Sequence, residues 1–344
     1  MSKNIDIWQY LRSTDRPIVL YGMGNGAEAV LAQLERIGKR AVGVFASDGF
    51  VRGQNFCGYI VSHYSDLLAR YPEMIILVCF GSNRPEVLSN IEELSQSHTV
   101  LCPDVPVYGD NVFDYAFAKK HAKEITAVYN LLADDESRKV YRQVIEFKLS
   151  GKTEKLRFCQ FDGGLFDLVD LSDQETYVDL GAYRGDTVQE FIKCVNGYNE
   201  IFAFEPNAKT YAKLCDNVNE FDNVHCINMA VADFNGVSQI FSAGRGSSIN
   251  KKGREISVCS LDSYFSDERI SLIKMDVEGQ EREALLGAVS LIKRCCPKLI
   301  VATYHRSEDI FSLPLLVHKI HPDYKIHVRH FPHNLAWDTN FYFI

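Results

Sequence analysis

One short apolar segment that ends in a glycine turn constrains this chain more than any other feature. Residues 177–187 read YVDLGAYRGDT, so that a strand carrying Asp179 leads to Gly181 and Gly185, and a helical pattern opens at Thr187. Glycines let the backbone approach a ligand where a side chain would block it, and helix amides add polar contacts. The Gly-x-x-x-Gly spacing differs from the dinucleotide fingerprint. It predicts a nucleoside-binding corner in an α/β fold.

Composition and charge exclude several classes of protein. With 344 residues, of which 46% are apolar, the chain is long enough for two domains with their own cores. A net charge of -8 without a concentrated basic face argues against a nucleic-acid partner. The N-terminus lacks the layout of a secretory signal, and no stretch reaches the roughly 20 apolar residues that span a membrane. We therefore expect a cytoplasmic protein without membrane insertion.

The cysteines predict no disulfide frame or zinc site. The chain has ten of them, without a Cys-x-x-Cys pair, and Cys295 and Cys296 are adjacent. This distribution is typical of reduced, mostly buried thiols.

Residues 1–110 predict a smaller Rossmann-like domain. A strand at 17–21 precedes a glycine-rich turn and a helix, and an acidic residue follows the second strand, where a ribose carboxylate would lie. The segment resembles domains that bind nucleotides or nucleotide-sugars in sugar-modifying enzymes, but a domain that has lost its ligand and serves in assembly is an equal alternative. The residues of the predicted nucleotide site are Gly22, Gly24, Asn25, Gly26 and Asp48.

Residues 111–160 predict a helical bridge. Apolar residues recur at helical spacing on both sides of the acidic segment 134–137, which indicates helices that face a core. Since this bridge lies between two α/β regions in the sequence, it is also a candidate wall of the second site.

The region 161–344 places further acidic residues at predicted strand ends. A strand at 200–204 ends in Glu205, where an ionised carboxylate can accept both ribose hydroxyls. Strands at 271–275 and 298–303 are followed by Asp276 and His305. Because the carboxyl ends of parallel strands lie on one rim, we expect these side chains to face one ligand cleft. We also expect a strand at 257–261.

Four motifs in order resemble the FkbM family of S-adenosylmethionine (SAM)-dependent methyltransferases. They are VDLGA at 178–182, FEP at 204–206, LDSY at 261–264 and IKMDVEGQE at 273–281. The resemblance implies a class I methyltransferase fold, with a mostly parallel seven-stranded sheet and an antiparallel C-terminal hairpin. It also implies that the SAM site is formed by Asp179, Gly181, Ala182, Tyr183, Gly185, Asp186, Thr187, Glu205, Pro206 and Ala230.

Family members are mostly O-methyltransferases that act on hydroxyls of sugars, polyketides and related metabolites. His305 is the leading candidate for the general base because the unperturbed pKa of histidine is about 6.5. Asp276 is the second candidate, either as base or as acceptor of the substrate hydroxyl. His305 could instead serve only in hydrogen bonding.

Four further predictions concern substrate and metal. Glu278, Arg329 and His330 are candidate substrate contacts, although Glu278 could equally cap the following helix. A loop with Arg245 could close over SAM or be an exposed connection. Hard cations need more oxygen ligands than this sequence offers, so we expect no metal; the alternative is a divalent cation bound by Asp276 and Glu278, of which Asp276 is the leading candidate ligand. The six histidines from His305 onward do not converge as a metal cluster.

The resulting hypothesis is a SAM-dependent O-methyltransferase of carbohydrate biosynthesis, whose acceptor is a sugar, a polysaccharide precursor or a sugar-containing metabolite. The partner is thus a small molecule or nucleotide-sugar. The sequence leaves open whether the protein forms a homo-oligomer. A nucleotide-sugar oxidoreductase or epimerase that uses the N-terminal turn is one alternative. A non-catalytic SAM-binding sensor is the other.

Overall fold

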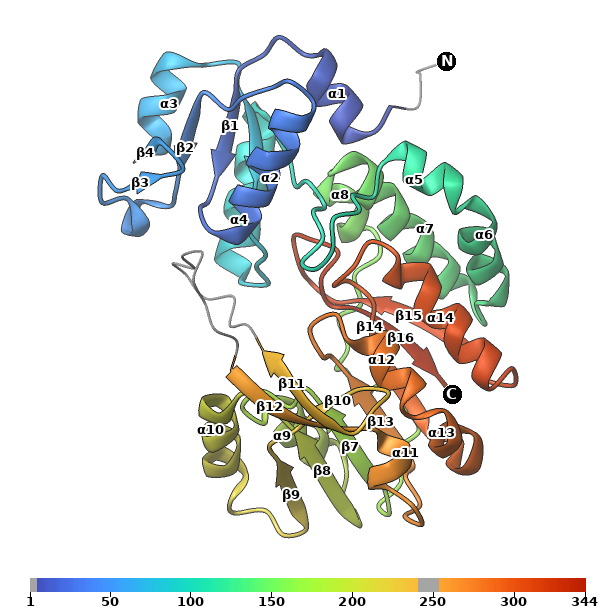
Figure 1. Ribbon diagram of the computed structural model, residues 1–344. Coiled ribbons are helices and arrows are strands. Elements are labelled where there is room, and N and C mark those ends of the chain that lie inside the picture. The colour runs from blue at the N-terminus through green and yellow to red at the C-terminus, as the bar shows by residue number, and fades with distance from the viewer. Residues whose placement is uncertain (1–4, 241–253) are drawn as a thin grey trace. The chain divides into compact units, whose positions relative to one another are not determined.

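The computed structural model in Figure 1 describes residues 5–240 and 254–344, which leaves the loop around Arg245 outside the described residues. The chain divides into two compact units, each formed by segments that are distant in sequence. The first unit consists of the chain up to residue 126 with 135–161 and 329–339, and the second of 127–134, 162–328 and 340–344. The domain boundaries at 110 and 160 remain predictions.

A six-stranded sheet with the order β3-β4-β2-β1-β5-β6 forms the first unit's α/β part. Each neighbouring pair is parallel except β3 and β4. The central strands β1 and β5 are buried along their whole length, which is the pattern of parallel strands covered on both faces. The strands are β1 (Ile18–Tyr21), β2 (Gly43–Phe45), β3 (Asn55–Phe56), β4 (Tyr59–Ser62), β5 (Ile75–Val78) and β6 (Thr99–Leu101).

The helices of this unit follow from apolar spacing and from capping. Helix α1 begins after Asp6, whose carboxylate accepts a hydrogen bond from the Gln9 amide at 2.8 Å. Helix α7 starts at the acidic segment and buries Val140, Val144 and Phe147. The bounds are α1 (Ile7–Ser13), α2 (Asn25–Arg36), the 3-10 helix η1 (Asp48–Phe50), α3 (Tyr64–Arg70), α4 (Pro85–Ser97), α5 (Tyr115–Lys120), α6 (Ala122–Leu131), which ends in the second unit, α7 (Asp135–Ser150) and α8 (Thr153–Arg157).

A buried ion pair stabilises the helical part of the first unit. The Lys148 Nζ atom on α7 lies 2.9 Å from the Asp104 Oδ2 atom after β6, and both side chains are buried. Because each charge compensates the other out of water, removing one partner alone would leave an uncompensated buried charge.

The second unit contains a seven-stranded sheet with the order β15-β16-β14-β13-β7-β8-β9. The strands from β14 to β9 pair in parallel, whereas β16 pairs antiparallel with β14. This confirms the predicted class I methyltransferase sheet and its C-terminal hairpin. The strands are β7 (Thr176–Leu180), β8 (Glu200–Phe204), β9 (Val224–Ile227), β13 (Leu272–Met275), β14 (Lys298–Ala302), β15 (Ile326–His330) and β16 (Thr339–Phe343).

A small additional sheet with the order β10-β12-β11 belongs to the same unit. Its strands are β10 (Ala230–Val231), β11 (Gly236–Ile240) and β12 (Arg254–Cys259). The helices of the second unit are α9 (Asp186–Cys194), α10 (Ala208–Val218), α11 (Leu261–Tyr264), α12 (Glu281–Leu286), α13 (Val289–Cys295) and α14 (Asp309–Ile320).

The strand predicted at 257–261 is wrong at its C-terminal end. Strand β12 stops at Cys259, and Ser260 becomes the N-cap of α11 by accepting a hydrogen bond from the Ser263 amide. The Asp262 carboxylate then accepts hydrogen bonds at 2.7 Å and 3.0 Å from two amides near the start of α13. The LDSY motif therefore joins two helices, a function that β-propensity alone does not reveal.

No helix in the two described ranges combines the length and the apolar character needed to cross a membrane.

Candidate active site

The glycine turn between β7 and α9 is fixed by contacts that leave no room for side chains. Gly181 has a φ of +79°, and a Cβ added to it would lie 1.9 Å from the carbonyl oxygen of Asp276. Gly185 has a φ of +87°, and its Cβ would lie 2.8 Å from Val218. The amides of Gly181 and Ala182 both donate to the Phe204 carbonyl oxygen. The turn is thus held against the ends of β8 and β13, and only glycine fits at its two corners.

Beneath this turn lies a buried ion pair. The Lys274 Nζ atom lies 3.1 Å from the Asp179 Oδ1 atom, and it donates a hydrogen bond to the Gly181 carbonyl oxygen at 3.2 Å. The Thr187 hydroxyl donates to the other oxygen of Asp179. Burial alone would lower the pKa of Lys274, but the charges of Asp179 and Asp276 outweigh it and raise the pKa. Lys274 therefore stays an ammonium that links β13, β7 and the turn.

The interior position of Asp179 limits what it can do. Its side chain is fully buried, with one oxygen facing Lys274 and the other accepting from Thr187. Asp179 therefore shapes the glycine turn from below. Tyr183 and Asp186 of the same corner are exposed.

Glu205 follows β8 as predicted and presents a carboxylate at the strand end. Its Oε1 atom accepts a hydrogen bond from the Asn207 amide at 2.7 Å. Burial raises the pKa of Glu205, although hydrogen bonds from the amides of Asn207 and Tyr183 partly oppose the shift. These amides fix the carboxylate in place. The neighbouring Pro206 is half-buried, as is Ala230 in β10.

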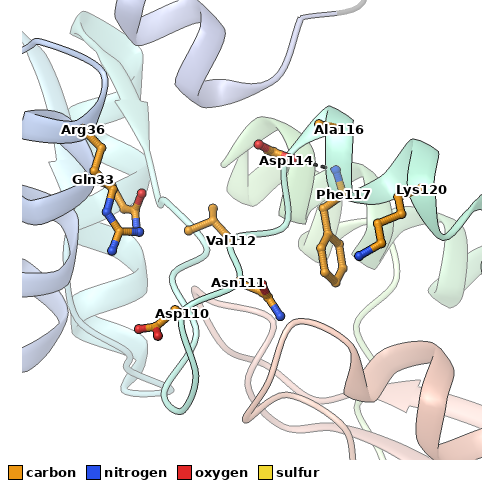
Figure 2. Close-up of a pocket in the computed structure, with 9 residues that line it drawn as sticks. All are labelled: Gln33, Arg36, Asp110, Asn111, Val112, Asp114, Ala116, Phe117 and Lys120. Carbon is orange, nitrogen blue, oxygen red and sulfur yellow. Dashed lines mark hydrogen bonds between the residues drawn. The ribbon is translucent and has the colours of Figure 1, made fainter.

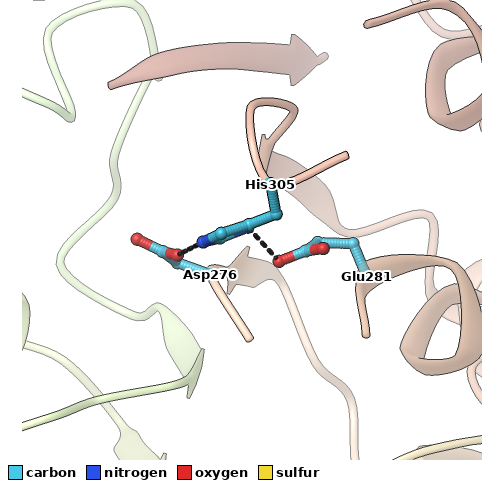
Figure 3. A group of neighbouring side chains, drawn as sticks. All are labelled: Asp276, Glu281 and His305. Atoms are coloured by element: carbon cyan, nitrogen blue, oxygen red, sulfur yellow. Dashed lines mark ion pairs between the residues drawn. The ribbon is translucent and has the colours of Figure 1, made fainter. Parts of the chain in front are cut away.

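The carboxyl ends of β13 and β14 bring His305 into a cluster of carboxylates (Figure 3). The Nδ1 atom of His305 lies 2.9 Å from Glu281 Oε1, while Nε2 lies 3.5 Å from Asp276 Oδ1 and 3.6 Å from Glu278 Oε2. The His305 and Glu281 side chains are buried, whereas Asp276 is one-third exposed and Glu278 is largely exposed. The Tyr304 hydroxyl donates to Asp276 Oδ2 at 2.9 Å.

The environment changes the protonation of His305 from what the sequence predicts. Burial lowers its pKa, but the hydrogen bond and charge of Glu281, with the charges of Asp276 and Glu278, outweigh burial and raise the pKa to about 9. The ring is therefore an imidazolium at neutral pH in this structure. The premise for choosing His305 as the base, an ordinary pKa near 6.5, is not met.

The same cluster brings together groups that can ligate a metal ion. One ligand atom each from Asp276, Glu281 and His305 lies within 4.8 Å of the others. However, the two carboxylates face opposite nitrogens of the imidazole, as Figure 3 shows, and the lone pairs of these nitrogens diverge. An ion held by Nδ1 would have Glu281 within reach, and one held by Nε2 would have Asp276 and Glu278. The contacts of these residues are those of an ion-pair cluster. The expectation of no metal stays a prediction.

Arg329 and His330 are the last two residues of β15, and they are assigned to the first unit although the strand begins in the second. The Arg329 Nη1 atom donates to the Ser137 hydroxyl at 2.8 Å, and its guanidinium lies over the ring of Phe161. His330 is fully buried with Nδ1 3.0 Å from the Thr339 hydroxyl oxygen, and burial lowers its pKa to about 3. Their predicted role as substrate contacts stays a prediction.

The glycine turn of the first unit differs from that of the second. A Cβ on Gly22 would lie 2.4 Å from the Phe80 ring and one on Gly26 would lie 2.4 Å from the Cys79 carbonyl oxygen, but Gly24 faces open space. Helix α2 begins at Asn25 without a side-chain cap. Asp48 is exposed, and its Oδ1 atom lies 2.9 Å from His63 Nδ1.

A groove of about 370 Å³ lies at the other end of α2 (Figure 2). It is adjacent to the C-terminal turn of this helix, whereas the predicted nucleotide site is at its N-terminus, and its lining mixes both signs of charge. The lining residues are Gln33, Arg36, Asp110, Asn111, Val112, Asp114, Ala116, Phe117 and Lys120.

Three residues of the candidate site were not predicted as site residues. Lys274, Glu281 and Tyr304 each contact a predicted residue directly. The signal for the first two is the spacing of the IKMDVEGQE motif, which places a lysine two residues before Asp276 and a glutamate five residues after it. Tyr304 directly precedes His305 and could have been found only from the folded loop.

Comparisons with known proteins agree with this geometry. Residues 179–329 match the family model described as the methyltransferase FkbM domain. The fold of the whole chain is similar to the crystal structure of methyltransferase FkbM from Methylobacillus flagellatus KT, with a TM-score of 0.75, 20% identity, and coverage of 100% of this chain and 96% of that chain. No protein with curated annotation matches the chain.

Two further solved structures resemble only part of the chain. A SAM-dependent methyltransferase from Aquifex aeolicus has 16% identity and a TM-score of 0.32, covering 56% of this chain and 97% of its own. Aeropyrum pernix fibrillarin with bound SAM has 14% identity and a TM-score of 0.34, covering 52% of this chain and 71% of its own. Scores this low support no structural argument. The family model and the whole-chain fold agree with the sequence motifs: residues 179–329 match the methyltransferase FkbM domain, and the chain shares its fold with a methyltransferase FkbM.

Proposed function

We propose that the protein is a SAM-dependent O-methyltransferase that acts on a hydroxyl of a sugar or sugar-containing metabolite. The observation that supports this most is the gathering of ionisable side chains at the carboxyl ends of the parallel strands of an FkbM domain. Glu205 follows β8, Asp276 follows β13 and His305 follows β14, while the glycine turn follows β7. Ligands of open α/β sheets bind at this edge.

The donor site fits SAM in two respects. The glycine turn packs directly against the ends of β8 and β13, so that its backbone lies at the edge of the sheet where a nucleoside would bind. The Glu205 carboxylate, held by the Asn207 amide, keeps lone pairs with which to accept ribose hydroxyls. SAM supplies a methyl group that its positive sulfur already activates. The protein therefore mainly has to hold an acceptor oxygen in line, which can contribute about 7–11 kcal/mol.

Asp276 is the residue that we assign to the acceptor hydroxyl. Its carboxylate is one-third exposed, whereas His305 behind it is buried and protonated. The Tyr304 hydroxyl and the His305 imidazolium fix the carboxylate from two sides. Asp276 accepts the hydrogen bond of the acceptor hydroxyl and takes its proton during transfer. A base of this kind contributes about 10²–10⁴-fold in rate, so alignment of the oxygen remains the larger effect.

We also propose that the first unit binds a nucleotide or nucleotide-sugar part of the acceptor. This binding depends on the turn from Gly22 to Gly26 and on Asp48, which follow β1 and β2 of the first unit. An oxidoreductase that uses this turn would bind NAD there. A sensor would bind SAM without transferring its methyl group.

Calorimetry with SAM and NAD separates these functions. We expect SAM to bind to the native protein, and Glu205→Ala to weaken its binding at least about 10-fold because charged hydrogen bonds to the ribose are lost. Asp48→Ala is the matched control, since it removes the carboxylate after the second strand of the other unit, and SAM affinity should not change. Tight NAD binding without SAM binding would contradict the proposal, and SAM binding without turnover across sugar acceptors would favour the sensor.

A further inference from the structure

We propose that Glu281 is a positioning residue of the methyl-transfer site, which orients the His305 ring and holds the loop at 277–280 that presents Glu278. This inference deepens the proposed function and rests on it, because only the proposed function identifies this cluster as the methyl-transfer site. The contacts themselves are independent of any ligand. Glu281 contacts His305 on one side and the loop on the other.

Glu281 fixes the loop through backbone amides. Its Oε1 atom accepts hydrogen bonds from the Val277 amide at 2.9 Å and from the Gly279 amide at 3.4 Å. Between these residues, Glu278 has a φ of +56°, and Gly279 has a φ of +85°. A non-glycine residue in the left-handed region is strained and persists only where its surroundings hold it. The two hydrogen bonds to Glu281 provide that restraint.

Glu281 also fixes the direction of the imidazole. The Oε1 atom lies 2.9 Å from His305 Nδ1, and both side chains are almost fully buried. With Nδ1 held by this carboxylate, Nε2 points to Asp276 and Glu278. Rotation of the ring would leave a buried carboxylate without its cation, which is costly in a low dielectric. Glu281 therefore determines which nitrogen faces the acceptor carboxylate.

The remaining charged groups around His305 belong to other elements. Asp276 and Glu278 precede α12, and Asp309 is a buried residue at the start of α14. Asp309 accepts a hydrogen bond from the Arg306 amide at 2.8 Å. Burial and then the charge of Glu281 raise the pKa of Asp309 to about 7. Of these groups, Glu281 is the one that pairs with His305 and also binds the loop amides.

Glu281→Gln separates the charge of this side chain from its shape. The amide oxygen of glutamine can still accept from the loop amides, but the ion pair with His305 is lost. We expect NMR titration of the His305 ring to show a pKa at least about 1 unit below that of the native protein. The resonance is assigned by its absence in His305→Gln. Glu283→Gln, two residues along the same helix, is the matched control and should leave the titration unchanged.

Hydrogen exchange reports on the contact between Glu281 and the loop amides. Glu281→Ala should speed exchange of the Val277 and Gly279 amides by about 10-fold, whereas Glu281→Gln should keep their protection. An unchanged His305 titration in Glu281→Gln, or an equal shift in Glu283→Gln, would overturn the proposal. If the Glu281 variants do not fold, the His305 titration is measured in Asp276→Asn, which keeps Glu281 and removes the carboxylate on the other side of the ring. His305 should then stay above its ordinary pKa because Glu281 remains, and a return to about 6.5 would overturn the proposal.

These measurements are made on the protein without ligand. Failure of SAM to bind to the native protein would refute the proposed function and leave the titration result intact. A normal SAM affinity with an unchanged titration in Glu281→Gln would refute only the role of Glu281.

Discussion

The two glycine turns of this chain each have two glycines four positions apart, but their surroundings differ. In the first unit, the turn after β1 packs against the Phe80 ring and the Cys79 carbonyl oxygen, and the acidic residue after β2 is exposed. In the second unit, the turn after β7 lies on the buried pair of Asp179 and Lys274, and the acidic residue after β8 is buried. A glycine turn alone thus indicates a fold, and the buried charges at the strand ends distinguish the candidate site in the second unit.

The largest expected effect comes from comparing the buried ion pairs of the two units. Lys274→Met leaves the fully buried Asp179 without its cation, and Lys148→Met does the same to Asp104. Each change should lower the free energy of unfolding by about 3–5 kcal/mol, as measured by urea denaturation.

Of these two changes, only Lys274→Met should change the affinity for SAM. Because Lys274 also donates to the Gly181 carbonyl oxygen, its loss should weaken SAM binding in calorimetry, whereas Lys148→Met should preserve the affinity. The double change Lys274→Met with Asp179→Leu should recover part of the stability without recovering the affinity. Equal SAM affinities in the two single variants would remove the distinction between the pairs.

The backbone supplies the second comparison. Gly181→Ala combines a left-handed φ with a Cβ 1.9 Å from a carbonyl oxygen, whereas Gly24→Ala has a φ of +114° and open space around the Cβ. We expect a loss of about 3 kcal/mol or more for Gly181→Ala, since strain and overpacking add, and about 1–2 kcal/mol for Gly24→Ala, where strain acts alone. Urea denaturation measures both, and equal losses would show that the turn at Gly181 can relax.

The sequence predicted the fold and which candidate residues lie at strand ends, but it did not predict the protonation of these residues. Strand periodicity and the glycine spacing place Asp179, Glu205, Asp276 and His305 correctly at strand ends, because these signals are local. The pKa of His305 depends on Glu281, which is 24 positions away and buried with it. The end of β12 was missed for a similar reason, since Asp262 caps a helix that begins 27 residues later.

Buried histidines give the two units opposite responses to pH. The folded pKa of His305 is raised from 6.5 to about 9, so its stabilisation is complete below pH 6.5 and is lost as the pH rises through 9. This contribution amounts to about 3 kcal/mol. Burial lowers the pKa of His333 to about 4, so His333 contributes stability that is lost as the pH falls from 6.5 to 4.

Urea denaturation across pH tests this difference. His305→Gln should flatten the decline in stability between pH 6.5 and 9, while the acid side stays unchanged. The pKa of Asp309 is raised from 3.8 to about 7, so its protonated form contributes stability that is lost as the pH rises from 3.8 through 7. Asp309→Asn should remove this second decline. A His305→Gln profile that keeps the native slope above pH 6.5 would mean that the imidazolium is not stabilised by its carboxylates.

The smallest effect is expected at Asp48. This carboxylate is 88% exposed and pairs with the half-exposed His63, so Asp48→Ala should change the free energy of unfolding by less than about 0.5 kcal/mol. If the first unit binds a nucleotide-sugar as proposed, the same variant should weaken binding of UDP-glucose in calorimetry while SAM affinity stays native. Glu205→Ala is the control, with the opposite pattern. Undiminished UDP-glucose binding in Asp48→Ala would exclude this carboxylate from the site, and no binding to the native protein would leave the first glycine turn as part of a scaffold.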